Sequence, residues 1–318
     1  MTSIFITIPW FSPAYKAGGP IRSIAGMVKE LAGLPLQFSV ICSNKDLDGQ
    51  VLEVPVDVWV PFGQNCKVWY CSNTEVLPVL KKEIKETAPA YLFINGIYNW
   101  KYNIKPILLV AGIKKIISPR GMLHPGALSQ KSFKKKIFIW LFNIFGWQKK
   151  YFFHATDEEE KKIVEKKLGN SAKVFVAGNF PGLYKYVAPP IKLAGQLKLF
   201  SIGLISPMKN HLLVLQALGA LGKNPDIKIE YNIYGPVKDN IYWNKCLAVI
   251  NCLPANIHVL YYGAVAPGFI ENVLLQNQVF ILPSKSENFG HSIIEALSAG
   301  RPVITSGATP WNNLQQSM

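Results

Sequence analysis

The chain has 318 residues, which is enough for one large or two medium-sized domains. Its hydrophobic content of 49% and its 22 prolines are typical of a packed globular protein and exclude an intrinsically disordered one. The 34 lysines and arginines outnumber the 19 aspartates and glutamates and give a formal net charge of +15. This imbalance favours anionic partners such as nucleic acid, anionic lipid or phosphorylated ligands.

Cysteine usage and apolar runs indicate the compartment. The five cysteines show no C-x2-C spacing and are odd in number, which favours a reduced, cytosolic setting. The apolar start "MTSIFITIPWF" lacks a basic region and contains Pro9, so we interpret it as a first buried strand rather than a signal peptide. The longest apolar run, "IFIWLFNIFGW", is shorter than the ~20 residues that cross a bilayer. We therefore predict no transmembrane span.

In the first half of the chain, short apolar runs alternate with helical patterns. We predict strands at 4–9, 36–43, 90–96, 112–119, 151–156 and 173–179. We predict helices at 19–33, 74–87 and 156–169, and a long basic helical region that ends near Lys150. The stretch between the second strand and the second helix reads as irregular. In the third helix, Thr156 and Glu159 form a predicted capping box and Gly169 a stop.

A proline-rich, non-periodic segment at 187–196 is predicted to be a linker, and a second alternating series follows it. Strands are predicted at 197–203, 227–235, 256–263, 278–284 and 302–305, and helices at 209–222, 240–253, 268–277 and from His291 onward. Alternation of this kind implies parallel sheets with right-handed crossovers. We predict an N-terminal domain at 1–186 and a C-terminal domain at 197–318, both doubly wound, with ligands at the carboxyl ends of the strands in a cleft between them.

The stretch "SENFGHSIIEALSAGRPVIT" places Glu287 and Glu295 on either side of a predicted helix start. One interpretation is structural, because Ser292 and Glu295 have the spacing of a capping box. The other is functional. Gly290 allows close approach of the backbone to a ligand, and the helix that begins near His291 presents its positive end to an anion such as a phosphate. The two glutamates would then bond sugar hydroxyls on either side of that phosphate.

This stretch, read from "PSKSENFG" to "TPW", resembles the donor-binding signature of retaining GT-B glycosyltransferases of family 4, whose two glutamates have seven residues between them. Four further stretches resemble family motifs in the same order along the chain: "GGPIRSI", "ISPRGMLHPGAL" with "FFHATDEE", "LFSIGLISPMKNH" and "GPVKDN". Members with such N-terminal motifs build bacterial surface polysaccharides. The resemblance implies a GT-B fold, with two Rossmann-like domains facing across a cleft, and no metal or other cofactor.

The resemblance also implies residue roles. Glu287 would contact the donor sugar at its anomeric centre, and Lys209 would neutralise the diphosphate leaving group. Glu295 would bind the nucleotide ribose. The remaining donor-binding residues would be Gly18, Gly19, Arg120, Asn288, Phe289, Gly290 and His291.

Two departures from the family pattern stand out. Leu204 occupies the position at which the family has an arginine, so the alternatives are weaker donor binding or substitution by Arg120 or Arg22. Family members also continue past "TPW" through further helices, so we expect this chain to be truncated and its C-terminal domain incomplete.

Some signals lie outside the donor signature. Asp46 and Asp48 form a D-x-D in a polar loop, but the surrounding turn residues favour a structural role over a metal site. His124 follows a predicted strand end and is a candidate to bond the donor sugar or the acceptor. Asn179 is a weaker candidate for the cleft. His154 and His211 are interpreted as packing or capping groups.

The segment "SQKSFKKKIFIWLFNIFGWQKK" interleaves lysines with aromatic residues. It is either a core helix with a solvated basic face or an interfacial segment that rests on anionic lipid. The candidate membrane- or acceptor-binding residues are Lys131, Lys134, Lys135 and Lys136. No nucleic-acid motif accompanies the charge, so nucleic acid is not an expected partner.

The sequence thus predicts a retaining hexosyltransferase that moves a sugar from a UDP- or GDP-sugar to a polyprenyl-diphosphate-linked glycan in bacterial surface-polysaccharide synthesis. Such an enzyme would be cytoplasmic and peripheral on the inner face of the cell membrane. The alternatives are a catalytically impaired donor-binding or membrane-associated module, and a nucleotide-sugar epimerase or hydrolase.

Overall fold

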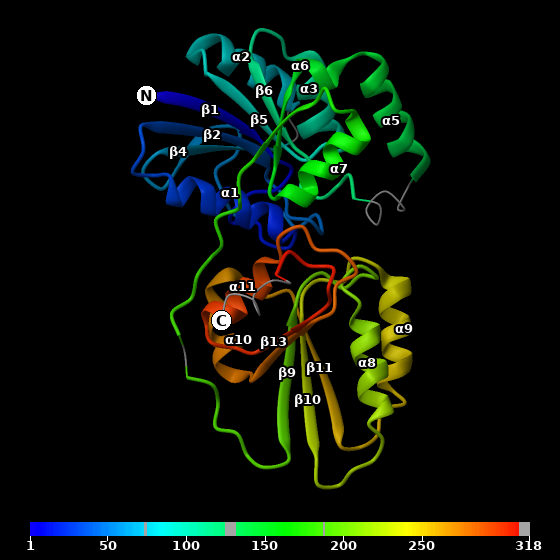
Figure 1. Cartoon of the computed structure of the whole chain (residues 1–318). Coiled ribbons are helices and arrows are strands. Elements are labelled where there is room, and N and C mark those ends of the chain that lie inside the picture. The colour runs from blue at the N-terminus through cyan, green and yellow to red at the C-terminus, as the bar shows by residue number, and fades with distance from the viewer. Residues whose placement is uncertain (73–74, 125–131, 187, 312–318) are drawn as a thin grey trace. The chain divides into compact units, whose positions relative to one another are not determined.

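The computed structural model describes residues 1–72, 75–124, 132–186 and 188–311 (Figure 1). The chain divides into two compact units, Met1–Phe180 and Pro181–Met318. Each unit is built on a largely parallel sheet with helices on both faces. The predicted fold class, two doubly wound α/β domains, is confirmed.

The first unit contains a sheet of eight strands in the order β3-β4-β2-β1-β5-β6-β7-β8. The strands are β1 (Thr2–Thr7), β2 (Leu36–Ser43), β3 (Trp59–Phe62), β4 (Cys66–Cys71), β5 (Tyr91–Asn95), β6 (Lys114–Ser118), β7 (Phe152–Ala155) and β8 (Lys173–Val176). All neighbouring strands pair in parallel except β3, which runs antiparallel to β4 at the edge. The carboxyl ends of β5 to β8 therefore meet at one edge of the sheet.

The helices of the first unit cover both faces of this sheet (Figure 1). They are α1 (Gly19–Glu30), α2 (Val76–Thr87), the π-helix η1 (Trp100–Ile104), α3 (Lys105–Leu109), α5 (Ser132–Ile144), α6 (Trp147–Lys150) and α7 (Glu158–Leu168). Alternating strand residues separate two cores: Phe5 packs with α2, α3, α5 and α7, whereas Ile6 packs with α1. This alternation explains why the central strands read as continuous apolar runs.

The second unit contains five strands, all parallel, in the order β11-β10-β9-β12-β13. The strands are β9 (Gln196–Ile202), β10 (Lys228–Tyr234), β11 (Ile257–Gly263), β12 (Val279–Leu282) and β13 (Val303–Thr305). The helices are α8 (His211–Ala220), α9 (Asn240–Ile250), the 3-10 helix η2 (Pro267–Phe269), α10 (Ile270–Gln276) and α11 (His291–Ser298). One core lies under α8 and α9, and the other lies under α10 and α11 on the opposite face (Figure 1).

Three local predictions in the first unit need correction. The stretch expected to be irregular contains the hairpin β3–β4, which the sequence disguises because Pro61 lies in the edge strand β3. The segment 100–109, for which no helix was predicted, forms η1 and α3. The cap of α7 is shifted by one residue: Asp157 accepts a bond from the backbone N–H of Glu160 at 2.7 Å, and Glu160, not Glu159, bonds back to Thr156. Gly169 ends the helix as expected.

The described residues also bear on the predictions about membrane spans and cysteines. None of their helices combines the length and the apolar character that a membrane span requires. All five cysteines are free, and four of them, Cys42, Cys66, Cys71 and Cys246, are buried. Burial raises the pKa of the Cys66 thiol to about 12, so this thiol is unreactive at neutral pH.

Candidate functional site

The candidate donor site lies at the carboxyl edge of the second sheet, where two loops follow neighbouring strands. The loop 203–210 connects β9 to α8, and the loop 283–290 connects β12 to α11. The backbone N–H of Lys285 donates to the carbonyl of Met208 at 2.8 Å and joins the two loops. Because β9 and β12 are adjacent and parallel, residues 78 positions apart in the sequence become neighbours here.

Lys209 and Glu287 form an ion pair between these loops. The Lys209 ammonium donates to the carboxylate of Glu287, and the hydroxyl of Ser284 donates to the same carboxylate oxygen at 3.1 Å. The two side chains are only 19% and 13% exposed. The stem of Lys209 lies over Gly203, where an added Cβ would be 3.7 Å from Cε. The two residues predicted to act on the donor are therefore paired with each other at the carboxyl edge of the second sheet.

The start of α11 requires a glycine. Gly290 has a φ of 76°, and a Cβ there would lie 2.9 Å from Ile293 and 3.1 Å from Glu287. Gly290 is the N-cap and has no side chain, so Ser292 is not the N-cap that the alternative capping box requires. The positive end of the helix dipole faces the loop that carries Glu287.

An aromatic cluster braces this loop. The indole N–H of Trp311 donates to the carbonyl of Phe289, and the two rings make an edge contact at 5.4 Å. The ring of Phe289 also contacts that of His291 at 4.7 Å. The side-chain oxygen of Asn288 is shielded from solvent and has no hydrogen-bond partner among the described residues, so it remains an acceptor for a ligand hydroxyl.

Glu295 lies one turn into α11 and is 3% exposed. Its carboxylate faces Gly182, at which an added Cβ would lie 3.7 Å from Oε1. The segment around Gly182 is held against α11 because the backbone N–H of Tyr184 donates to the hydroxyl of Ser298 at 3.0 Å. Glu295 thus lies on the same helix as the N-terminus at His291, separated from Glu287 by that first turn.

His211 begins α8, directly after the loop that carries Lys209. It is fully buried, and neither ring nitrogen has a hydrogen-bond partner among the described residues. Burial, with a contribution from the Lys209 charge, lowers the pKa of His211 to about 4. The imidazole is therefore neutral at pH 7. The sequence suggested a packing or capping group, and nothing in the pattern indicated that both ring nitrogens would be buried without a partner among the described residues.

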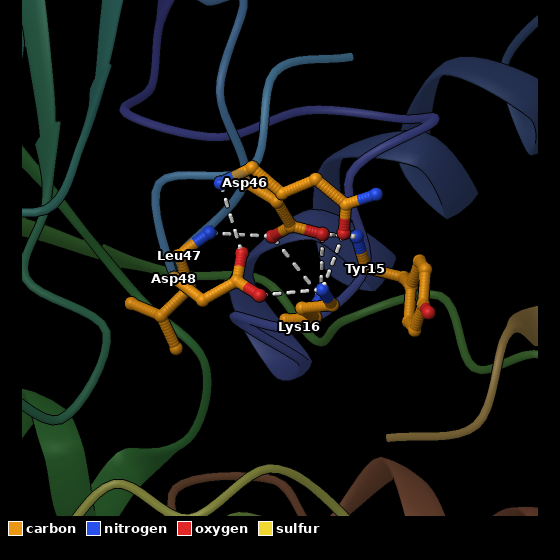
Figure 2. Close-up of polar contacts among 6 residues, drawn as sticks. Tyr15, Lys16, Asp46, Leu47 and Asp48 are labelled. Atoms are coloured by element: carbon orange, nitrogen blue, oxygen red, sulfur yellow. Dashed lines mark hydrogen bonds and ion pairs between the residues drawn. The ribbon is translucent and has the colours of Figure 1, made fainter. Parts of the chain in front are cut away.

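In the first unit, the D-x-D pair anchors the loop that precedes Gly18 (Figure 2). The Asp46 carboxylate accepts bonds from the backbone N–H groups of Tyr15 at 3.0 Å and Lys16 at 3.2 Å, and Asp48 pairs with the Lys16 ammonium at 2.6 Å. Both carboxylates therefore have structural partners. The described residues contain no group of three or more His, Cys, Asp or Glu side chains that could hold a metal.

Gly18 and Gly19 follow this anchored loop. Gly18 is the N-cap of α1 with a φ of 70°, and a Cβ at Gly18 would meet nothing within 4 Å. Gly19 begins the helix. The role of Gly18 and Gly19 in donor binding stays a prediction.

Arg120 lies at the carboxyl edge of the first sheet with a φ of 54°. Its guanidinium donates to the side-chain oxygens of Asn95, at 2.7 Å, and of Asn179. Burial lowers its pKa to about 10, and Glu160 opposes this shift, so Arg120 stays charged at pH 7. Sequence reasoning identified Arg120 and Asn179 but missed Asn95, whose signal is its position near the end of the predicted strand 90–96.

His154 and Glu160 extend this network. The Nδ1 of His154 is 2.9 Å from the hydroxyl of Ser118, and its Nε2 is 2.8 Å from the carbonyl of Ala177. Glu160 accepts from the backbone N–H of Gly121 at 2.6 Å. Burial and the neighbouring Arg120 charge lower the pKa of His154 to about 4. The network fixes the loop that leads to His124.

The remaining predicted residues are placed as follows. His124 is half-buried, and its backbone N–H donates to the carbonyl of Gly121 at 3.1 Å. Lys134 and Lys136 are exposed on α5, and Lys135 lies over the ring of Tyr98 at 5.3 Å. Lys131 lies outside the described residues.

The structure therefore groups Lys209, Glu287 and the start of α11 at one edge of the second sheet. Arg120 and His124 lie on one loop at the edge of the first sheet, and Gly18 with Gly19 forms a separate group after β1.

Comparisons with known proteins concern the family of the second unit and the fold of the chain. Residues 188–312 match the family model described as "Glycosyl transferases group 1", so the second unit contains a domain of this kind. No curated protein matches the chain.

Several solved structures share the fold. Sucrose-phosphate synthase from Thermosynechococcus elongatus is 12% identical, with a TM-score of 0.73 over 98% of this chain and 83% of that one. HepE of Anabaena, in complex with UDP-glucose, is 15% identical, with a TM-score of 0.65 over 97% and 81%. WaaG, a glycosyltransferase involved in lipopolysaccharide biosynthesis, is 15% identical, with a TM-score of 0.61 over 99% and 84%. The chain thus has the two-domain α/β fold of GT-B glycosyltransferases.

Proposed function

We propose that this chain is a retaining glycosyltransferase that moves a hexosyl group from a nucleotide-sugar to a lipid-linked glycan in bacterial surface-polysaccharide synthesis. The observation that carries the proposal is the grouping of Lys209, Glu287 and the N-terminus of α11 at one sheet edge. This grouping lies within the residues that match the glycosyl transferases group 1 model. A cation, a helix N-terminus and a carboxylate together suit a ligand in which a diphosphate joins a sugar.

Lys209 would neutralise the leaving group. When the bond between the anomeric carbon and the diphosphate breaks, negative charge grows on the diphosphate oxygens, and a preorganised cation stabilises that charge more than it stabilises the intact donor. In the structure the ammonium is bonded to Glu287. Donor binding would move the Lys209 ammonium from the carboxylate to the diphosphate and leave Glu287 to bond the sugar.

The transfer itself would proceed on one face of the sugar. The acceptor oxygen forms a bond to the anomeric carbon from the side that the diphosphate leaves, so the configuration is retained. The acceptor proton passes to the departing phosphate oxygen, which balances the charge without a protein nucleophile. Arg120, His124, Gly18 and Gly19 are proposed to contribute from the first unit, and no metal is required in this scheme.

The donor is proposed to be a UDP- or GDP-sugar. UDP-glucose is the ligand in the HepE complex, and that observation supports a nucleotide-sugar without selecting a base for this chain. A thermal-shift screen with UDP, GDP and their sugars tests the proposal, because a ligand at 100-fold its Kd stabilises the folded state by about 2.7 kcal/mol. We expect one base to raise the melting temperature, and we expect Lys209→Ala and Glu295→Ala to abolish the shift.

A matched control lies on β9, the strand that precedes the loop of Lys209. Lys198, near the start of β9, pairs with Glu230 at 3.8 Å, so Lys198→Ala removes an equal charge at the opposite edge of the sheet. We expect Lys198→Ala to keep donor binding. Glu287→Ala should lower turnover by about 10²- to 10³-fold, the range for loss of one electrostatic group in an active site. Full activity of the Glu287 variant would refute its role.

Two other outcomes would favour the rival functions. Donor binding without turnover would indicate a binding module. Hydrolysis or epimerisation of the donor in the absence of any glycan acceptor would indicate a nucleotide-sugar hydrolase or epimerase. Transfer onto a lipid-linked glycan with retained configuration, established by NMR of the product, is the result that the proposal requires.

A further inference from the structure

The middle of the first unit has an unusual charge distribution. Residues 87–156 contain no aspartate or glutamate. The same stretch carries eleven basic residues: Lys101, Lys105, Lys114, Lys115, Arg120, Lys131, Lys134, Lys135, Lys136, Lys149 and Lys150. Helix α7 packs against α5. It contains four glutamates and four lysines, so it leaves the positive sign of this charge unchanged. A partner for this region must therefore be anionic or neutral.

One face of α5 is apolar and exposed. Phe133, Ile137, Trp140 and Ile144 are 75%, 40%, 61% and 57% exposed, and Phe145, which follows the helix, is 61% exposed. At 100° per residue the four helical side chains fall within an arc of about 60°, so they form one stripe. Isolated exposed apolar residues are ordinary, but a continuous stripe of large ones marks an interaction surface.

The opposite face of α5 is fixed to the core. Phe142 is fully buried and packs with Phe138, Trp147 and Phe153 through edge and tilted ring contacts. The buried face cannot exchange with the exposed stripe unless this core is disrupted. The helix is therefore held in one orientation, in which the apolar stripe points to solvent.

Lysines flank the stripe on both sides. Lys134 and Lys136 are exposed, and their helical positions lie about 100° to one side and about 60° to the other side of Phe133. Lys149 and Lys150 are also exposed in α6, directly after Phe145 and Trp147. An apolar strip with lysines along its margins is the arrangement by which a helix lies in a membrane interface: the rings enter the acyl boundary and the ammonium groups stay at the headgroups.

We infer that the exposed stripe of α5 docks the protein onto an anionic lipid bilayer, with Phe133, Ile137, Trp140 and Ile144 inserted and Lys134 and Lys136 at the phosphates. The α5 helix has 13 residues, fewer than the ~20 of a membrane span, so it lies along the surface. The charge selects the occupant, because a protein partner would need a carboxylate-rich patch, whereas an anionic bilayer supplies both negative charge and an apolar layer. This inference is independent of the sugar-transfer chemistry.

The experiment is vesicle sedimentation of the full chain without donor or acceptor. Vesicles of phosphatidylglycerol and phosphatidylcholine in equal parts are compared with vesicles of phosphatidylcholine alone. We expect binding to the anionic vesicles that falls as salt rises, because exposed charges are screened. Phe133→Ser with Trp140→Ser should lower the partition coefficient at least tenfold, the loss expected when one or two large apolar side chains no longer insert.

The matched control is Ile241→Ser with Phe269→Ser, which removes two side chains of the second unit that are 75% and 62% exposed. This variant should bind as the unmodified chain does. Lys134→Glu with Lys136→Glu should abolish the preference for anionic vesicles. Hydrogen exchange should show that the vesicles protect peptides from 132–145.

Three results would overturn the inference: equal binding to both vesicle types, equal losses in the test and control variants, or a dimer in solution that Phe133→Ser with Trp140→Ser dissociates without any change in lipid binding. The last result would make the stripe an interface between copies of the chain. Because no nucleotide-sugar is present in the assay, failure of lipid docking would leave the proposed sugar transfer untouched, and inactivity of the enzyme would leave the docking result untouched.

Discussion

The anchoring of the loop before Gly18 by Asp46 makes a quantitative prediction possible. Asp46 is 3% exposed, and its carboxylate accepts from three backbone N–H groups, those of Tyr15, Lys16 and Leu47 (Figure 2). Asp48 lies two residues further along the same loop, but its side chain is 48% exposed, and it pairs with the exposed end of the Lys16 side chain. The two aspartates have the same chemistry and different burial, so they form a natural pair for comparison.

The magnitude follows from the count of bonds. A hydrogen bond to a charged group contributes about 1.5–3 kcal/mol, and a buried donor left without a partner costs about 1–3 kcal/mol. The N–H of Leu47 is local and becomes hydrated easily when the loop relaxes, whereas those of Tyr15 and Lys16 lie about thirty positions away in the sequence. We therefore expect Asp46→Ala to lower the free energy of unfolding of the first unit by about 2–4 kcal/mol.

Urea denaturation of the two alanine variants measures this difference. Asp48→Ala should leave the midpoint unchanged, because an exposed ion pair is screened by solvent. Asp46→Asn keeps one acceptor oxygen and loses the charge, so it should fall between the wild type and Asp46→Ala. Hydrogen exchange at residues 13–19 should accelerate in Asp46→Ala alone. If the two alanine variants have equal midpoints, the burial argument is wrong.

Two further predictions concern packing and pH. Gly235→Ala places a Cβ 1.9 Å from the carbonyl oxygen of Gly203, so it should destabilise the second unit by at least about 3 kcal/mol in denaturant titration, while Gly268→Ala, which meets nothing within 4 Å, should have little effect. The pKa values of His154 and His211 are lowered to about 4, so both are neutral in the folded chain when the unfolded chain takes up protons near pH 6.5. The free energy of unfolding should therefore be highest above pH 6.5. Between pH 6.5 and pH 4, each of the two histidines should lower it by up to about 1.4 kcal/mol per pH unit. His211→Phe should reduce this slope, and an unchanged slope in this variant would contradict the assignment.

Secondary structure and fold class followed from the sequence because apolar periodicity and glycine positions are local. The strand 36–43 and the helix 76–87 lie within a few residues of their predicted bounds. The hairpin of β3 and β4 was missed for an equally local reason: Pro61 conceals an edge strand whose stability comes from pairing with β4, a partner that the pattern of one segment does not show.

The candidate donor-site residues could be proposed from the sequence, because a strand, a glycine loop and a helix start fall within one continuous stretch, 278–298. The contacts between these residues and the rest of the chain could not be predicted in this way. The pairing of Glu287 with Lys209 depends on two loops brought together by parallel strands, and Asn95 becomes a partner of Arg120 because β5 lies beside β6. Such contacts join positions that are distant along the chain, and no local pattern encodes them.

The sequence by itself determined a long helical region, rich in lysine and aromatic residues, that ends near Lys150. It left open whether the aromatic side chains were core or surface, since the helical period is the same in both cases. Only the tertiary structure decided this, because the sheet buries Phe142 on one face and leaves Phe133 and Trp140 facing water on the other. The physical reason is that burial is a property of what packs against a helix, and that information lies in the other elements of the fold.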